Sequence, residues 1–270
     1  MAKKWTIKEK FSKKNELRLL YVKKNKPIGE IAKILDIGES TVYDRLLRLK
    51  IPINRKNKEG YNNIRNDIYI PEKFSENLAE FVGILLGDGH LSLSQVSVTL
   101  GKKDEYADHV MDLMENLFHA RPKKILTKRK DVVIYIGSTM LVRWFVSMGL
   151  VHNKVQYQVD FPRWIFKNRK YMTRTLKGFF DTDGSVYKLR YGAQMSYCNK
   201  SKPLLKSARI MLLELGYSPS KINNSKNIYL TRRQDLFRYL REIGFGNKKH
   251  EKRFLKFTKY KGVSHSGNCT

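Results

Sequence analysis

The chain has 270 residues, of which 41% are hydrophobic and 11% aromatic, and its 54 Lys and Arg against 25 Asp and Glu give a formal net charge of +29. The hydrophobic share can fill two or three small cores, which excludes a disordered basic tail. The excess positive charge indicates a polyanionic partner. Because no predicted helix combines a basic face with a long apolar one, a membrane surface is not expected, and nucleic acid is favoured.

The expected location is inside the cell, in the cytoplasm or an organelle matrix, and secretion is not expected. The two cysteines, Cys198 and Cys269, are too few for a disulfide framework or a zinc cluster. No apolar run approaches the ~18 residues that span a bilayer, and residues 1–5 lack the apolar core of a signal peptide.

Residues 1–51 are predicted to form a small all-α domain. Apolar spacing places its helices at residues 16–23, 28–35 and 39–49. Gly38 would permit the tight reversal before the last helix, and Ser40 would cap that helix. The sequence on both sides of this turn resembles helix-turn-helix DNA-binding domains. A three-helix bundle used only for packing or protein contact is the alternative.

The helix-turn-helix resemblance implies that the last helix enters the major groove with its N-terminal half. The residues expected to face bases are Ser40, Thr41, Tyr43 and Asp44, and those expected to reach phosphates are Arg45 and Arg48. Residues 52–68 are polar, basic and rich in turn residues. We expect them to be a linker that lies along DNA.

Two runs in different halves of the chain, residues 81–89 and 176–184, carry the strongest signal. Each is an apolar helical stretch with a glycine in its middle and an Asp-Gly at its end, at Asp88 and Asp183. A single Asp-Gly is a common turn and would indicate only a helix end. The surroundings of the two runs repeat as well, which points to a duplication.

After each Asp-Gly the predicted elements follow the same order: two strands, a helix, two strands and a closing helix. The first copy is assigned to residues 69–162 and the second to residues 163–262, with 263–270 as a tail. The chain is therefore predicted to be α+β, with an αββαββα unit present twice about a pseudo-twofold axis, behind the small all-α helix-turn-helix domain.

The paired motifs resemble those of the LAGLIDADG homing endonucleases in their single-chain form, over residues 70–260. Leu86 stands where the family name carries its earlier acidic residue, whereas the second motif keeps Asp181. The later aspartate, which the family uses for chemistry, is present in both copies as Asp88 and Asp183. The resemblance implies a monomer that cuts both strands of a long, asymmetric double-stranded DNA target.

The two aspartates are expected to need a metal ion. Gly83 and Gly178 leave room for the motif helices to pack closely, which would bring Asp88 and Asp183 together at the negative ends of the helix dipoles. This is unfavourable unless a cation lies between them, and hard oxygen ligands with a phosphate substrate indicate Mg²⁺, with Mn²⁺ as a substitute. The further candidate ligands are the backbone carbonyls of Gly87 and Thr182.

Four lysines occupy matching positions in the two copies, Lys103 with Lys200 and Lys154 with Lys248. The family resemblance implies a polar or basic residue near the active site at both points. In a chain this basic such pairs also arise by chance. Catalysis and the clamping of a backbone phosphate both remain open for each pair.

Alternation along the strands predicts which side chains face DNA. Val132, Ile134 and Ile136 are expected to point inward and Tyr135 outward, and Ile228 and Leu230 likewise inward. The candidate DNA contacts of the two sheets and their loops are Lys128, Arg129, Lys130, Tyr135, Lys188, Arg190, Gln194, Ser196, Asn223, Tyr229 and Arg232. Arginine to guanine and asparagine or glutamine to adenine are the usual pairings. For any one of these residues, a solvated strand face is the alternative.

The leading functional hypothesis is a site-specific double-strand DNA endonuclease. One alternative is a DNA-binding transcriptional regulator that does not cleave, and loss of the aspartates would be its signature. Both aspartates are retained, which favours the enzyme. The other alternative is an RNA splicing maturase, because RNA would also account for the positive charge.

Overall fold

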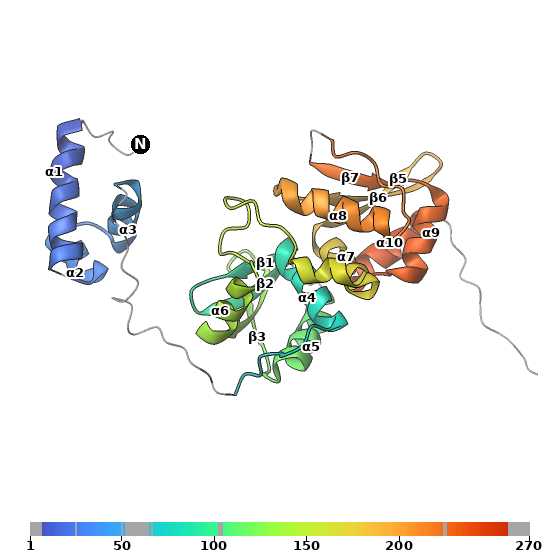
Figure 1. Cartoon of the computed structure of the whole chain (residues 1–270), viewed down its shortest axis with the longest axis horizontal. Helices are drawn as coiled ribbons and strands as arrows, with labels where there is room; N and C mark the ends of the chain where they lie inside the picture. The colour runs from blue at the N-terminus through green and yellow to red at the C-terminus, as the bar shows by residue number, and fades with distance from the viewer. Residues whose placement is uncertain are drawn as a thin grey trace, which may run out of the picture. The chain divides into compact units, whose positions relative to one another are not determined.

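The computed structural model of the chain describes residues 7–24, 26–49, 51, 65, 67–101, 105–223 and 226–258. The chain folds as two compact units, residues 1–62 and 63–270, each with a hydrophobic core of its own (Figure 1). Within the described residues, no helix is both long and apolar enough to cross a membrane.

The first unit is a small helical bundle. Its elements are α1 (Ile7–Leu17), the π-helix η1 (Arg18–Lys23), α2 (Ile28–Ile34) and α3 (Glu39–Arg48). Each of them contributes to the core, which includes Leu17, Tyr21, Ile31, Val42 and Leu46. The apolar spacing therefore predicts η1, α2 and α3, but it misses α1, because no helix was expected before residue 16. The use of these helices as a helix-turn-helix stays a prediction.

The turn between α2 and α3 differs from the prediction in two details. Asp36 rather than Gly38 adopts the left-handed conformation, with φ of 48°, which aspartate tolerates better than most residues. Gly38 is not left-handed, with φ −66° and ψ 149°, and it occupies the N-cap position of α3. Ser40 therefore lies inside the helix, and no side chain caps α3.

The centre of the second unit is a pair of packed helices, α4 (Glu76–Gly87) and α7 (Arg169–Asp183). Ser75 is the N-cap of α4 and Asn168 the N-cap of α7. Their side-chain oxygens accept backbone N–H groups of the first turn, at 3.1 and 2.9 Å respectively. Residues 78–86 of α4 are buried without interruption. A helix that is buried on all sides belongs to the interior of the unit.

The first repeat carries a four-stranded antiparallel sheet in the order β1-β2-β4-β3. Its elements are β1 (Gly89–Leu91), β2 (Gln95–Leu100), α5 (Tyr106–Phe118), β3 (Lys123–Leu126), β4 (Val132–Gly137) and α6 (Thr139–Ser147). The register pairs Val98 with Ile134, and both side chains are fully buried. Tyr135 lies on the other face, so the alternation predicted for β4 is confirmed.

The second repeat carries a three-stranded antiparallel sheet in the order β5-β6-β7. Its elements are η3 (Arg163–Lys167), β5 (Gly184–Leu189), β6 (Gly192–Cys198), α8 (Lys202–Glu214), β7 (Asn227–Leu230), α9 (Arg233–Glu242) and α10 (Lys248–Thr258). Ile228 and Leu230 are buried as predicted. Helix α10 follows the closing helix α9 and is additional to the predicted repeat.

The described part of the second sheet lacks the strand expected to precede β7. Ser220 Oγ accepts the N–H of Tyr229 at 3.0 Å, and Asn223 Oδ1 accepts the N–H of Asn227 at 2.9 Å. Side chains thus take N–H groups that the backbone carbonyls of a neighbouring strand would otherwise accept. The segment runs beside β7 without forming a regular strand.

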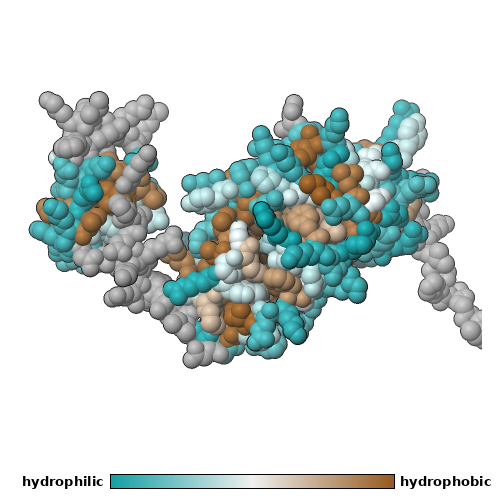
Figure 2. All heavy atoms as spheres, in the orientation of Figure 1, coloured by the Kyte–Doolittle hydropathy of each residue, from teal (hydrophilic) through white to brown (hydrophobic). Residues whose placement is uncertain are grey.

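One hydrophobic core runs through both repeats. Figure 1 shows the elements of the first repeat on one side of α4 and α7 and those of the second repeat on the other. Hydrophilic residues cover most of the surface of this unit that is visible in Figure 2, as the charge of the chain requires. The α+β fold with tandem repeats is confirmed, and the helix pair at its centre positions the candidate site.

Candidate active site

Glycines allow α4 and α7 to approach each other closely. A Cβ at Gly83 would lie 2.3 Å from the carbonyl oxygen of Thr175, and a Cβ at Gly178 would lie 2.1 Å from that of Glu80. Both neighbours are backbone atoms, so neither helix can yield locally. The prediction that glycines permit this close packing is confirmed.

The close packing brings the two candidate carboxylates together. Asp88 is the C-cap of α4, and Asp183 is the last residue of α7. A Cβ at Gly87 would lie 3.5 Å from Asp183 Cγ, so Asp183 faces the end of the opposite helix. The pKa of Asp183 is raised to about 7, because burial and the negative charge of Asp88 outweigh a hydrogen bond from Asn199 and the positive charge of Lys154.

Lys154 lies beside both carboxylates. Its Nζ donates to the carbonyl oxygen of Leu85 at 3.2 Å and also to that of Gly87. Burial lowers the pKa of Lys154, while the charges of Asp183 and Asp88 oppose that change. The structure therefore holds a half-buried amine at the point where the two helices end.

The matching lysine of the second repeat is placed differently. Lys248 is exposed at the first residue of α10. The loop before it is fastened instead by Asp181, whose carboxylate accepts the N–H groups of Gly246 at 2.8 Å and Asn247 at 3.0 Å. Burial raises the pKa of Asp181 to about 6 in spite of these hydrogen bonds. The first repeat has Leu86 at the equivalent position and cannot form this anchor.

Asn199 is a site residue that the sequence analysis missed. Its Nδ2 donates to Asp183 Oδ2, and its Oδ1 accepts the N–H of Ser201 at 2.7 Å, so the amide is held in one orientation. The search for basic residues at this strand end selected Lys200, which is exposed. The available signal was that Asn199, a neutral polar residue, directly precedes Lys200 in the sequence. Lys103, the proposed partner of Lys200, lies outside the described residues.

The donors around the helix ends fit a hard divalent cation in part. The carbonyl of Gly87 accepts the amine of Lys154, and its role as a metal ligand stays a prediction. Thr182 directs its hydroxyl to the carbonyls of Gly178 and Phe179, both at 3.1 Å. Among the described residues no three His, Cys, Asp or Glu side chains gather into a metal site. The carboxylates of Asp88 and Asp183 suit Mg²⁺ or Mn²⁺, and the backbone carbonyl of Thr182 stays a predicted further ligand.

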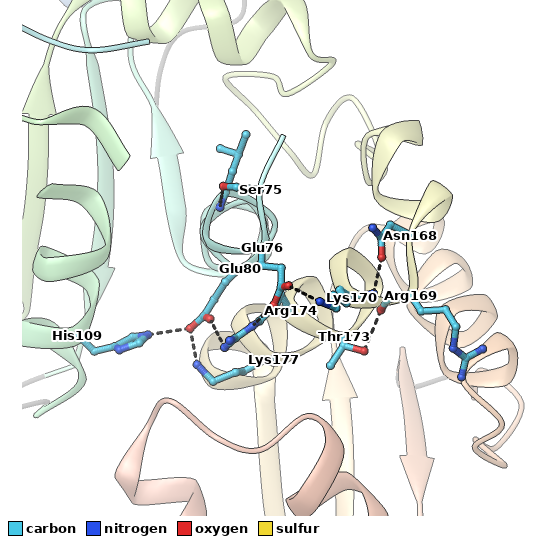
Figure 3. A network of polar contacts seen from close by, with 11 residues as sticks. Ser75, Glu76, Glu80, His109, Asn168, Arg169, Lys170, Thr173, Arg174 and Lys177 are labelled. Atoms are coloured by element: carbon cyan, nitrogen blue, oxygen red, sulfur yellow. Dashed lines mark hydrogen bonds and ion pairs between the residues drawn. The ribbon is translucent and has the colours of Figure 1, made fainter. Parts of the chain in front are cut away.

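A buried ionic network holds the same helix pair farther from the carboxylates (Figure 3). Glu80 of α4, 2% exposed, lies 2.7 Å from His109 Nε2 and 3.3 Å from the guanidinium of Arg174, and it also accepts Lys177. Burial alone would raise the pKa of Glu80, but the hydrogen bond from His109 and the charge of Lys177 outweigh it and hold that pKa below its usual value. The network ties α4 to α5 and α7.

The predicted DNA contacts are mostly accessible. Exposed residues among them are Ser40, Thr41, Tyr43 and Arg48 on α3, the loop Lys128, Arg129 and Lys130, and Arg190, Asn223 and Arg232 in the second repeat. Arg45, Tyr135, Gln194 and Tyr229 are half-buried.

Two of the predicted contacts need correction. Ser196 is only 1% exposed, between its partners Ser185 and Tyr229 on the two neighbouring strands. Lys188 pairs with Ala193 across the sheet, while Gln194 pairs with Tyr187. Since neighbouring residues of a strand point to opposite faces, Lys188 does not share a face with Gln194.

Comparisons with known proteins agree with this fold. Residues 170–244, which contain Asp183 and much of the second repeat, match the family model of the LAGLIDADG-like domain. The match confirms the resemblance for the second motif, so residues 170–244 form a LAGLIDADG-like domain.

Curated relatives cover most of the chain. The replication factor C small subunit of Methanocaldococcus jannaschii is 26% identical over 69% of this chain but only 10% of its own length. Uncharacterized protein MJ0314 of the same organism is 28% identical over 68% of this chain and 71% of its own length. The chain spans between 10 and 21% of the first three curated relatives.

Two of the solved structures that resemble this chain carry the LAGLIDADG name or a bound DNA in their descriptions. The N-terminal LAGLIDADG domain of DUF199/WhiA is 16% identical with a TM-score of 0.46, covering 67% of this chain and 89% of that domain. The homing endonuclease I-DmoI in complex with DNA and Mn is 17% identical with a TM-score of 0.47, covering 63% and 96%.

Proposed function

From the LAGLIDADG-like domain that the chain carries, we propose that this protein is a site-specific endonuclease that hydrolyses both strands of duplex DNA with the help of a divalent metal. The observation that carries the proposal is the convergence of Asp88 and Asp183 at the ends of two helices that glycines bring together. Each repeat contributes one carboxylate, as cleavage of two antiparallel strands requires.

Phosphodiester hydrolysis needs an activated water and neutralisation of the negative charge that develops on the phosphate oxygens. Mg²⁺ or Mn²⁺ held by Asp88 and Asp183 would supply both. Lys154 adds a positive charge beside the two carboxylates, where a charge-assisted hydrogen bond to a phosphate oxygen is strong. Asn199 keeps the carboxylate of Asp183 in one orientation.

Duplex DNA is the partner that the charge of +29 supports best. The two sheets present different side chains on either side of the helix pair, so the target site should be asymmetric. Because both repeats lie in one chain, one molecule should occupy one site as a monomer.

The names of the curated relatives also support a self-contained module. Three of them are named as a replication factor subunit, an aminotransferase and an ATP synthase subunit, whose activities are unrelated. This chain matches 10, 19 and 11% of their respective lengths. Because proteins with such different activities share this segment, we infer that it carries none of their named activities. It fits a genetic element that spreads between genes, which is the use of a site-specific nuclease.

Substitution of the carboxylates tests the proposal. Asp88→Asn and Asp183→Asn should each reduce double-strand cleavage of a random duplex library with Mg²⁺ to background, while the affinity for DNA in the absence of metal stays within about twofold. Asp112→Asn, an exposed residue of α5, is the matched control and should cleave as the wild type does. Wild-type cleavage by either active-site variant would contradict a shared metal site.

The first unit is proposed to read DNA with α3, on which Ser40, Thr41 and Tyr43 are exposed. Deletion of residues 1–66 should shorten the footprint on DNA and flatten the salt dependence of binding, because fewer counterions are then released, with a slope change of about 0.9 for each lost phosphate contact. Cleavage should persist at higher protein concentration. An unchanged footprint would mean that this unit does not contact DNA.

A DNA-binding regulator that does not cleave is the second candidate, and the position of Lys154 favours it. Its amine donates a hydrogen bond to the carbonyl of Gly87 and lies near both aspartates. It can therefore balance their negative charge without a metal. Calorimetric titration with Mn²⁺ separates the two candidates. A nuclease should bind the metal through Asp88 and Asp183, whereas the regulator should bind DNA with equal affinity and sequence preference with or without it.

A further inference from the structure

Lys188 lies on the core face of the second sheet, next to a cavity that is separate from the candidate active site. It pairs with Ala193, and two residues away Val186 pairs with Met195. Ala193, Val186 and Met195 are all buried. Since every second residue of a strand shares a face, Lys188 extends this buried row beyond the end of the core, where it remains exposed.

A cavity of about 430 Å³ opens at this point. The turn between β5 and β6, the start of α9 and the end of α10 enclose it, and these elements lie together at the same end of the second repeat in Figure 1. The side chains that give it its character are Lys188, Arg190, Arg233, Tyr191, Phe237 and Phe257. Three are cationic and three aromatic, and no lining residue is acidic.

The cations of this cavity are not neutralised by neighbouring carboxylates. Arg238 on the same helix α9 pairs with Glu242 at 3.0 Å, but among the described residues Lys188, Arg190 and Arg233 form no ion pair. The guanidinium of Arg233 instead lies 5.5 Å from the ring centroid of Phe237. Unpaired cations above aromatic rings attract a ligand that has both a negative charge and a flat face.

We propose that this cavity binds one nucleoside monophosphate unit. The phosphate would be held by Arg190, Arg233 and Lys188, and the base would stack on the exposed ring of Tyr191 or on Phe237. The volume is in the range of small-molecule sites, and aromatic side chains with arginine are a recurrent platform for single nucleotides. An acidic peptide would satisfy the charge but would not use the rings in the same way.

Two sources can present this chemistry, a free nucleotide or an unpaired nucleotide at the end of a bound DNA strand. The site lies apart from Asp88 and Asp183 and does not depend on cleavage. Adenosine monophosphate binding should therefore persist in the Asp88→Asn variant, so a failure of this proposal is distinguishable from a failure of the proposed nuclease.

Calorimetry or NMR titration of the full chain tests the site with adenosine monophosphate, adenosine and inorganic phosphate as separate probes. Adenosine monophosphate should bind at least about tenfold more tightly than either part alone, because the site uses both halves of the ligand. Arg233→Gln should weaken binding by about tenfold. Arg241→Gln, an exposed residue of the same helix outside the cavity, should leave it unchanged.

The ring contribution and the source of the ligand are tested separately. Phe237→Leu keeps an apolar side chain and should weaken adenosine monophosphate but not inorganic phosphate. If the source is DNA, a duplex with a single-stranded overhang should displace the nucleotide and a blunt duplex should not; if it is a free nucleotide, neither duplex should.

The proposal is overturned if inorganic phosphate or an acidic peptide binds as tightly as adenosine monophosphate. It is also overturned if Arg233→Gln and Arg241→Gln behave alike, because the attraction would then be a property of the whole basic surface.

Discussion

The two repeats use the same chain order to build unequal halves of one site. In the first repeat Lys154 reaches the carbonyls of Leu85 and Gly87 and lies beside both aspartates. In the second repeat Asp181 fastens the corresponding loop through the N–H groups of Gly246 and Asn247, and Lys248 stays in solvent. The exchange of Leu86 for Asp181 accompanies this difference.

This comparison teaches that matched positions in a duplicated sequence need not have matched roles. Asp181 satisfies two backbone donors of its loop, whereas Leu86 can only pack in the core, where it is 1% exposed. In the first repeat the amine of Lys154 donates to the carbonyl groups of Leu85 and Gly87 at the end of α4. A cation is built into one half of the site, and the other half has the amide of Asn199 instead.

The largest effect is expected from disrupting the close contact between α4 and α7, to which both repeats contribute one helix. Gly178→Val should destabilise the second unit by about 3 kcal/mol or more, because the new side chain would meet the backbone carbonyl of Glu80 and neither helix can move aside. Urea denaturation followed by circular dichroism measures the loss. Gly101→Ala, at a position with open space around it, is the control, and an equal loss in both variants would show that the helix contact is not the cause.

The next largest effect is expected from the different positions of Lys154 and Lys248, and it concerns the rate of cleavage. Lys154→Met should reduce the rate of cleavage by roughly 10²-fold, as the loss of one electrostatic contact at a reacting group does, whereas Lys248→Met should change it by less than about threefold. Single-turnover kinetics on a cleaved target, with each strand labelled separately, would measure both. Equal losses would mean that the exposed lysine moves into the site when DNA binds.

The smallest effect concerns the pH dependence of stability. The pKa of Asp183 is raised to about 7 from its usual value near 3.8, so the folded state keeps a proton that the unfolded chain releases. The free energy of unfolding should therefore fall as the pH rises from about 4 to 7. Asp183→Asn should remove part of this fall without metal present, as measured by urea denaturation at several pH values. The same slope in wild type and variant would contradict a buried, strained carboxylate.

Much of the fold could be predicted from local sequence. Repeated order along the chain predicts the two repeats, and period-two alternation identifies the inward residues of β4 and β7, such as Ile134 and Leu230. The helix contact follows from Gly83 and Gly178. Turn details such as the left-handed Asp36 did not follow, because several residues tolerate the same backbone.

The candidate site was predictable only in part. Asp88 and Asp183 follow from the motifs, whereas Asn199 was missed because a neutral amide gives no charge signal. Glu80 was also missed, since a single glutamate in an apolar helix does not reveal that His109, Arg174 and Lys177 surround it. Lys188 was assigned to the wrong face, although alternation along β5 places it on the same face as the buried Val186 two residues before it.

The sequence by itself determined the duplication, the helical segments between residues 18 and 48, the basic character of the chain and the pair of aspartates that end the motif helices. These depend on composition and on spacings within one element, which the chain order records directly. The tertiary structure alone decided which matched lysine reaches the carboxylates and which neighbours hold Glu80 and Asp183. Such properties arise where segments far apart in the chain come into contact. The energy of such a contact depends on both segments, so neither segment alone predicts it.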